Sequence, residues 1–385
     1  MGDVESSAVT VKVVGDIRRL PAQQWNACAG TANPFVQHEF LAALEESGSA
    51  ASDTGWAPYH LVAEDAQGIS ACAPMYVKSH SQGEFVFDHG WAQAFERAGG
   101  QYYPKLLIAV PFTPATGPRL LVRPDLARDA MEDVLISGAI EVAQKHNLSS
   151  VNVNFPTEPE WQRLGAAGFL QRTGEQFHWQ NDGYESFEGF LNALSSRKRK
   201  AIKRERSGAI ENGIEIECLS GSDLREEHWD AFFDFYMDTG ERKWGRPYLT
   251  RPFYSLVGET MGDRVLLVMA KRDGRYIAGA LNFVGEDTLY GRYWGCLEDH
   301  PFLHFEVCYY QAIEYAIQHQ LGRVEAGAQG QHKLSRGYLP IHTYSAHWIA
   351  NPSFRRAVDN YLNQERAAVD EEIAALDAYS PFKKI

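Results

Sequence analysis

Apolar and polar positions follow the same order in two distant parts of the chain. Residues 59–77 (YHLVAEDAQGISACAPMYV) and 265–284 (VLLVMAKRDGRYIAGALNFV) each contain an apolar run, a charged turn around Gly68 or Gly274, and a second apolar run. Two apolar runs joined by a short polar turn with glycine predict a β-hairpin. The sequence therefore predicts one antiparallel hairpin in each half of the chain.

The segments around these hairpins also recur. An aromatic strand, a helix with apolar residues at helical spacing and a short strand are predicted, in that order, at residues 84–91, 125–146 and 149–155 and again at 288–295, 304–320 and 322–327. Residues 168–179 (GFLQRTGEQFHW) and 337–348 (GYLPIHTYSAHW) both have glycine, an aromatic residue and leucine, with His-Trp at the same offset. Each half therefore reads helix, helix, antiparallel strands, helix, strand, strand.

This duplication predicts two α/β domains. The boundary is expected near residue 180, where QNDGYESF supplies turn residues. The N-terminal domain then covers residues 1–180. The C-terminal domain covers residues 181–385 and carries a basic helix at 195–213 and a helical C-terminal tail.

Composition narrows the class of protein. A chain of 385 residues with 44% hydrophobic and 12% aromatic residues is typical of a folded globular protein. No apolar run reaches the roughly 18–20 residues that span a bilayer, so we expect no integral membrane segment. The net charge of −13 argues against a surface coated with nucleic acid, although a local basic patch can still bind phosphates.

The cysteines and the N-terminus bear on location. The five cysteines are scattered and never form a CxxC pair, which argues against a disulfide framework and against a zinc site. The N-terminus lacks the basic start and apolar region of a signal peptide. We therefore expect a cytoplasmic protein without a bound metal.

The segment 325–340 (EAGAQGQHKLSRGYLP) is the leading candidate for chemistry. The first half joins the corresponding strands through an ordinary short helix, so the polar residues of this loop are extra to the fold. Lys333 and Arg336 lie three residues apart and can face one anion, and Gln329 is a further substrate-binding candidate. His332 suits acid–base catalysis near neutral pH. A solvated polar turn is the alternative interpretation.

Two further pairs of residues are candidates on the neighbouring elements. His304 and Glu306 open the second-half helix, where an imidazole and a carboxylate would suit deprotonation of an amine. A glutamate in the first turn of a helix also commonly serves as a dipole partner, which is the alternative for Glu306. Arg292 and Trp294, on the preceding strand, either line the pocket or belong to the core.

The strongest basic run of the chain lies in the predicted helix 195–213. A helix would place Arg199, Lys203 and Arg206 on one face. The functional interpretation is a helix that binds phosphates of a nucleic acid or a phosphorylated acceptor, and the alternative is a solvated helix that offsets acidic surroundings. The phosphate-binding candidates are Arg197, Arg199, Lys200, Lys203 and Arg204.

Several of these segments resemble one known family. The segments at 33–48, 102–121, 304–317 and 327–340 are similar to a family of predicted N-acyltransferases labelled peptidoglycan biosynthesis/recognition proteins, and the resemblance covers nearly the whole chain. It implies an α/β, tandem duplicated GNAT fold, akin to that of the Fem-type aminoacyltransferases. It also implies an enzyme that transfers an acyl or aminoacyl group.

The resemblance also bears on the donor. Ordinary GNAT enzymes bind the coenzyme A pyrophosphate on a Gly-rich loop before the main helix. The equivalent segment 295–307 (GCLEDHPFLHFEV) has no Gly-rich run, and Glu298 and Asp299 would repel a pyrophosphate. This departure disfavours acyl-CoA and favours, by resemblance to Fem-type enzymes, an aminoacyl-tRNA as co-substrate. By the same resemblance, Fem-type proteins also carry a basic helix near the position of the predicted helix 195–213.

The sequence therefore predicts an N-acyltransferase or aminoacyltransferase that forms an amide on a small-molecule or peptide amine by a direct general-base mechanism. We expect no bound cofactor, with tRNA as a candidate partner. Two alternatives stay open: a non-catalytic recognition protein that binds an anionic or cell-wall precursor ligand, and an acyl-CoA-dependent N-acyltransferase.

Overall fold

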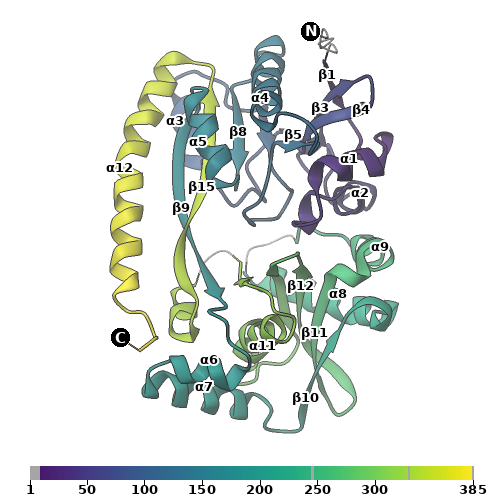
Figure 1. The fold of residues 1–385 in the computed structure, drawn as a ribbon, viewed down its shortest axis with the longest axis vertical. Coiled ribbons are helices and arrows are strands. Elements are labelled where there is room, and N and C mark those ends of the chain that lie inside the picture. Colours follow the sequence, from purple (N-terminus) through teal and green to yellow (C-terminus); the bar gives the residue numbers. More distant parts are fainter. Residues whose placement is uncertain (1–8, 244–246, 328–329, 384–385) are drawn as a thin grey trace, which may run out of the picture. The chain divides into compact units, whose positions relative to one another are not determined.

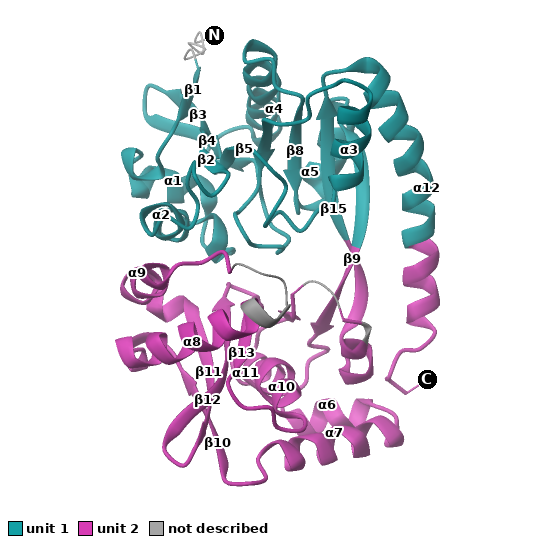
Figure 2. Cartoon of the chain, turned by 180° about the vertical axis from the view of Figure 1, so that it is seen from behind, with its two compact units in different colours: residues 1–174, 343–369 teal, residues 175–342, 370–385 magenta. Residues whose placement is uncertain are grey.

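The computed structural model describes residues 9–243, 247–327 and 330–383. The chain forms two compact units, which Figure 2 shows in different colours. Unit 1 comprises residues 1–174 and 343–369, and unit 2 comprises residues 175–342 and 370–385. The sequence predicted two contiguous domains with a boundary at residue 180, whereas each of these units consists of two separate segments of the chain. Strands β9 (Leu170–Gln180) and β15 (Leu339–Ile349) each begin in one unit and end in the other.

Unit 1 contains two sheets. Its main sheet is formed by β2 (Trp56–Pro58), β5 (Met75–Lys78), β6 (Lys105–Ile108), β8 (Ser150–Asn154) and the end of β15. Strands β6 and β8 are parallel, and the other neighbours in this sheet are antiparallel. The second sheet is formed by β1 (Thr10–Val14), β3 (His60–Asp65), β4 (Gly68–Ala73) and β7 (Leu121–Val122). The predicted hairpin at 59–77 is confirmed in β3 and β4, which pair antiparallel.

The helices of unit 1 are visible in Figure 1. They are α1 (Ala22–Ala29), α2 (His38–Glu46), α3 (His89–Arg97), α4 (Arg128–Lys145), α5 (Glu158–Ala166) and the part of α12 (Pro352–Asp377) up to residue 369. Helix α4 confirms the helix predicted at 125–146. It packs on the sheet through a core that includes Leu61, Leu106, Leu135 and Val151.

The strand predicted at 84–91 is wrong. These residues form an irregular, bent segment and the start of α3. Phe85 adopts a left-handed backbone with φ of 58°, which interrupts an extended strand. The buried carboxylates of Glu84 and Asp88 both bind the ammonium of Lys105 on β6, and these ion pairs connect the segment to the sheet.

Unit 2 has one sheet. It consists of β10 (Ile214–Leu219), β11 (Val265–Arg272), β12 (Arg275–Val284), β13 (Thr288–Cys296), β14 (Arg323–Glu325) and the end of β9. Only β13 and β14 are parallel neighbours among these described strands. The predicted hairpin at 265–284 is confirmed in β11 and β12, and the predicted strand at 288–295 is confirmed in β13.

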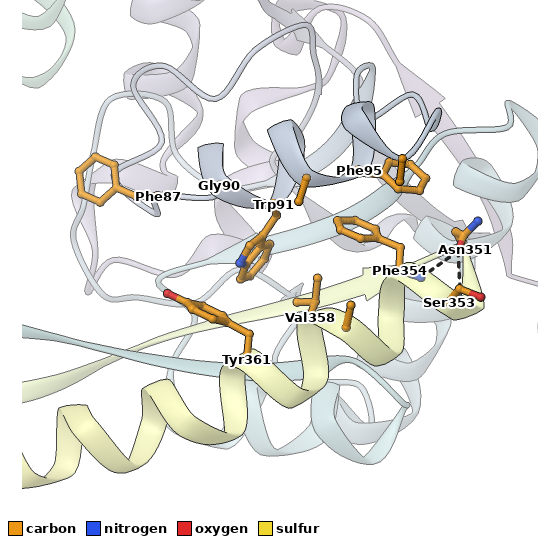
Figure 3. Close-up of a pocket in the computed structure, with 12 residues that line it drawn as sticks. Phe87, Gly90, Trp91, Phe95, Asn351, Ser353, Phe354, Val358 and Tyr361 are labelled. Atoms are coloured by element: carbon orange, nitrogen blue, oxygen red, sulfur yellow. Dashed lines mark hydrogen bonds between the residues drawn. The ribbon is translucent and has the colours of Figure 1, made fainter.

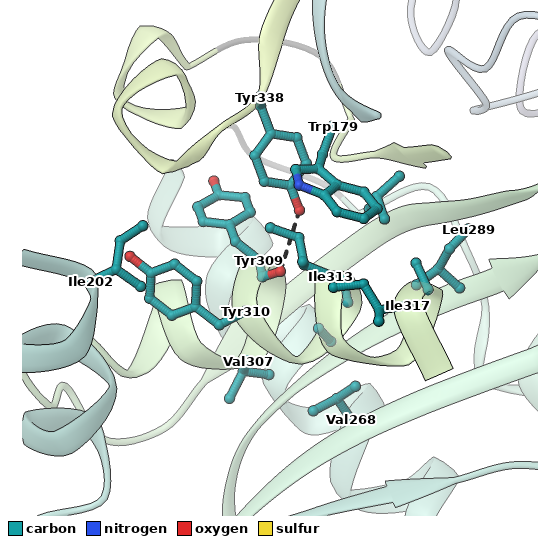
Figure 4. Close-up of a cluster of buried hydrophobic side chains, with 14 of the residues drawn as sticks. Trp179, Ile202, Val268, Leu289, Val307, Tyr309, Tyr310, Ile313, Ile317 and Tyr338 are labelled. Carbon is teal, nitrogen blue, oxygen red and sulfur yellow. Dashed lines mark hydrogen bonds between the residues drawn. The ribbon is translucent and has the colours of Figure 1, made fainter. Parts of the chain in front are cut away.

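The helices of unit 2 include the predicted basic helix. They are α6 (Phe187–Ala193), α7 (Ser196–Ala209), α8 (Glu226–Lys243), α9 (Arg251–Met261), α10 (Leu303–Phe305), a π-helical turn (Glu306–Tyr310) and α11 (Gln311–Gln318). The last three form one continuous helical segment in place of the helix predicted at 304–320. Figure 4 shows that Val307, Tyr310 and Ile313 from this segment lie in the same core as Val268 on β11.

The two repeats exchange their last strands. In unit 1, β15 pairs with β8, and His347 lies opposite Asn152. In unit 2, β9 pairs with β14, and His178 lies opposite Glu325. Burial lowers the pKa of both imidazoles to about 3. The duplicated His-Trp pairs therefore occupy matched positions, each in the unit that the other repeat forms.

Candidate functional site

The candidate site of unit 2 lies where its two parallel strands part. Strands β13 and β14 pair through three residues each, ending at Tyr290 opposite Glu325. Strand β14 then stops, while β13 continues along β12 to Cys296. At Gly291 the two strands still lie close together, because a Cβ there would be only 3.3 Å from the carbonyl oxygen of Glu325. We call the place where the pairing of β13 with β14 ends the strand fork.

Lys333 lies at this fork. It belongs to the 3-10 helix Gln331–Arg336, which is flanked by two glycines with left-handed backbones, Gly330 and Gly337. The side chain is only 3% exposed, and its Nζ donates to the carbonyl oxygens of Ala326 (2.8 Å) and Gly327 (2.9 Å). Burial lowers the pKa of Lys333 to about 8. The predicted loop lysine is therefore a buried cation at the carboxyl end of β14.

His332 sits in an aromatic cluster beside Lys333. Its Nε2 lies 3.0 Å from the hydroxyl oxygen of Tyr309, and its ring is 6.2 Å from that of His304 and 6.0 Å from that of Phe305. Burial, and then the charges of Arg336 and Lys333, lower the pKa of His332. This shift favours the neutral form of the imidazole, which is the form that can accept a proton.

A pocket of about 310 Å³ opens next to this cluster. His304 and Trp294 line it, and their rings are 5.1 Å apart. Thr239 from α8, together with Glu298 and Asp299 from the turn after β13, completes much of the wall. The structure thus places two of the predicted site residues on a pocket. It also adds Thr239 and Tyr309, which the sequence did not single out because their neighbours come from distant segments.

Arg336 links the candidate loop to the basic helix. Its guanidinium donates to both carboxylate oxygens of Glu205 on α7 (3.2 and 3.0 Å) and to the carbonyl oxygen of His332 (2.8 Å). It also lies 3.4 Å from the ring centre of Phe305. These contacts hold the loop against α7. The predicted role of Arg336 in binding substrate stays a prediction. The hydrogen bonds of its guanidinium to protein acceptors favour a structural role.

The carboxylate of Glu306, like the guanidinium of Arg336, is engaged by partners within the protein. It is 2% exposed and accepts hydrogen bonds from Arg206 on α7 and from Gln311. The general-base role stays a prediction, and the ion pair favours the structural alternative. Arg292 is half-buried, with its guanidinium 5.3 Å from the ring centre of Tyr293. The predicted residue Gln329 lies outside the described residues.

The basic helix α7 has two different faces. Lys203 pairs with Glu188 (2.9 Å), Arg206 pairs with Glu306 and Glu314, and Arg199 donates to Asn192 (3.3 Å). The face predicted from helical spacing is thus the face with internal partners. The other phosphate-binding candidates are exposed, share the opposite side by their spacing, and make no ion pair with any described residue: Arg197, Lys200 and Arg204.

The geometry therefore defines a tandem GNAT fold with a candidate site at the strand fork of unit 2. The chain belongs to the FemAB-like family, described as peptidoglycan biosynthesis/recognition, whose model matches residues 16–384. The predicted fold and family are confirmed. The predicted class, an acyl- or aminoacyl-transferase, agrees with this membership. A comparison with curated protein sequences gave no match.

Three solved structures share the fold. FemX aligns with a TM-score of 0.56 at 12% identity and covers 91% of this chain and 100% of its own. L-PGS from Bacillus licheniformis aligns at 0.52 and 11% identity, with coverage of 87% and 98%. The C-terminal domain of a putative lysylphosphatidylglycerol synthetase from Agrobacterium fabrum aligns at 0.55 and 10% identity, with coverage of 89% and 95%. None of the helices in the described ranges is both long and apolar enough to cross a membrane.

Proposed function

We propose that this protein transfers an aminoacyl or acyl group to an amine acceptor at the fork between β13 and β14. One observation carries the proposal: the buried ammonium of Lys333, with no carboxylate partner among the described residues, lies at the point where the two parallel strands part. A fixed cation at such a place stabilises the negative charge that develops on a carbonyl oxygen during acyl transfer.

The reaction is an attack of a neutral amine on the carbonyl carbon of an ester. A C–N bond forms, the C–O bond to the donor breaks, and the amine proton ends on the departing oxygen. We assign the proton transfer to His332, whose lowered pKa keeps it neutral and whose ring is oriented by Tyr309. His304 and Trp294 line the pocket for the reacting groups.

An aminoacyl-tRNA is the donor that we favour. The exposed cations Arg197, Lys200 and Arg204 form a face suited to a phosphate backbone. Glu298 and Asp299 line the pocket and would repel the pyrophosphate of an acyl-CoA. One of the similar structures is named a putative lysylphosphatidylglycerol synthetase, and this name also favours an aminoacyl group. A cytoplasmic location and the absence of a bound cofactor stay predictions.

A recognition protein without catalysis is the second candidate. The observation in its favour is that Glu306 and Arg336, two of the residues predicted to act on substrate, are held in internal ion pairs. Such a protein would bind an anionic or cell-wall precursor ligand and transfer nothing.

The test measures binding and turnover separately. Wild-type protein and the variants His332→Gln, Lys333→Met and Lys271→Met, the last a control on β11, are incubated with radiolabelled aminoacyl-tRNAs and a panel of amines. We expect amide formation by the wild type, a loss of about 10²–10³-fold in turnover for Lys333→Met, and little change for the control. Ligand binding without turnover by the wild type, with every aminoacyl-tRNA and with acetyl-CoA, would establish the recognition protein instead.

A further inference from the structure

Two of the five cysteines lie against each other in unit 1. Cys28 belongs to α1, Cys72 belongs to β4, and neither is in a disulfide. Cys72 is fully buried, Cys28 is 6% exposed, and a side-chain hydrogen bond joins the two thiols. Neither cysteine lines the apolar groove between α3 and α12 in Figure 3, and the transfer activity proposed above uses neither. Two cysteines already in contact can be joined by a disulfide with little backbone movement.

Regular secondary structure holds the two sulfurs together. The side-chain oxygen of Gln24 accepts a hydrogen bond from the N–H of Ile69 (3.1 Å), and the thiol of Cys28 donates to the carbonyl oxygen of Ile69 (3.7 Å). Gln24 and Cys28 are four residues apart, so they lie on the same face of α1. On β4, Ala71 faces the core shared with α4, and strand alternation therefore turns Cys72 to the opposite side, toward Cys28.

The surroundings make the two thiols chemically unequal. The hydrogen bond with Cys72, and then the charge of Arg123, lower the pKa of Cys28, and the opposing effect of Asp125 is smaller. The guanidinium of Arg123 donates to the same Ile69 carbonyl oxygen as the Cys28 thiol (3.2 Å). Burial raises the pKa of Cys72 well above its usual range. Cys28 is therefore the thiol that ionises first, and the thiolate is the reactive form of a cysteine.

We propose that Cys28 and Cys72 are an oxidation site, which forms a reversible disulfide when the protein meets hydrogen peroxide. The Cys28 thiolate attacks one peroxide oxygen, the O–O bond breaks, and Cys28 becomes a sulfenic acid while hydroxide leaves and takes up the proton that the thiol released. The sulfur of Cys72 then attacks the Cys28 sulfur, the S–O bond breaks, and a second water leaves with the Cys72 proton. Two thiols are oxidised and one peroxide is reduced to two waters.

The burial of the pair selects the oxidant and sets the consequence. Because Cys28 is only 6% exposed, a disulfide on another protein has poor access to it, whereas peroxide is a small molecule. The new bond joins α1 to β4 and closes the chain between residues 28 and 72, which restricts the unfolded state. In a reducing compartment such disulfides are transient, so the reduced pair is the resting form.

Cys218 on β10 is an internal control for simple accessibility. Its side chain is exposed, so oxidation governed by access alone would begin there. Desolvation, and then the carboxylates of Glu314 and Glu306, raise the pKa of Cys218 to about 11. The proposal therefore predicts that the buried Cys28 reacts before the exposed Cys218.

The test treats wild-type protein, Cys28→Ser, Cys72→Ala and Cys218→Ser with hydrogen peroxide and then alkylates the unfolded chains. The wild type and Cys218→Ser should each lose two alkylatable thiols, appear in mass spectra as one linked peptide pair containing Cys28 and Cys72, and regain both thiols with dithiothreitol. Cys28→Ser should keep all its thiols. Cys72→Ala should collect a dimedone adduct on Cys28, because the sulfenic acid then has no thiol to resolve it. Oxidised wild type should have a higher urea midpoint than reduced wild type.

Four results would overturn the proposal. The first is wild-type protein that keeps all five thiols at a peroxide concentration that oxidises free glutathione; this result depends on no variant. The second is oxidation that begins at Cys218 or links separate copies of the chain. The third is Cys72→Ala, folded by circular dichroism, that forms no dimedone adduct on Cys28. The fourth is an oxidised pair that dithiothreitol does not restore or that leaves the urea midpoint unchanged.

Discussion

Two lysines on neighbouring strands of unit 1 give the sharpest prediction about stability. Lys78 on β5 and Lys105 on β6 are register partners, and both are fully buried. Lys105 binds the carboxylates of Glu84 and Asp88. Lys78 instead donates to the carbonyl oxygen of Gly55 (3.0 Å) and has no carboxylate partner in the described part of the chain. We therefore expect different effects on the free energy of unfolding when each lysine is replaced by methionine.

Burial lowers the pKa of Lys78 to about 7, from 10.5. The unfolded chain thus holds a proton that the folded chain releases between pH 7 and 10.5, so the free energy of unfolding rises with pH across this window. The shift of about 3.5 units corresponds to a penalty of about 5 kcal/mol below pH 7. Between pH 7.5 and 9.5, Lys78 alone accounts for a rise of about 2–3 kcal/mol.

Urea denaturation of the wild type, Lys78→Met and Lys105→Met at pH 7.5 and 9.5 measures these effects. Lys78→Met should lose this rise of about 2–3 kcal/mol relative to the wild type. Lys105→Met should be destabilised by about 3–5 kcal/mol, because it leaves Glu84 and Asp88 buried without their cation. The reasoning fails if Lys78→Met keeps the full pH dependence or if Lys105→Met is as stable as Lys78→Met.

Three further predictions follow from other contacts. Replacing Arg197, Lys200 and Arg204 together by glutamine should lower the salt dependence of tRNA binding in a filter assay by about 2 units of log–log slope; the same slope as the wild type would remove α7 from the interface. Gly291→Ala should lower the free energy of unfolding by about 1–3 kcal/mol, because its Cβ would meet the Glu325 carbonyl at 3.3 Å. An unchanged urea midpoint would contradict this close approach of the two strands. Glu160→Gln should cost about 2–3 kcal/mol, because the buried carboxylate accepts from the backbone of Arg119 and Leu120 at 2.7 Å each, whereas the exposed control Glu158→Gln should melt like the wild type.

Local pattern determined much of the fold. The hairpins at 59–77 and 265–284, the helices at 125–146 and 195–213 and the duplication itself follow from residue spacing, because periodicity reports which face of an element is buried. The wrong prediction of a strand at 84–91 has the same origin, because it also rested on local pattern alone. Its aromatic residues resemble a strand, but Glu84 and Asp88 are committed to Lys105, a partner that periodicity cannot reveal.

For the candidate loop, too, the sequence indicated the residue types, whereas their contacts came from the tertiary structure. Its residue types marked the loop as extra to the fold, and Lys333 indeed lies at the strand fork. The sequence did not show that Arg336 and Glu306 are held by Glu205 and Arg206, which lie 131 and 100 residues away along the chain.

The sequence by itself thus determined the repeated elements, the family and the chemical character of the loop. Only the tertiary structure decided which charges of α7 face solvent and how the repeats exchange their last strands. These properties depend on contacts between distant segments, and such contacts exist only once the chain has folded.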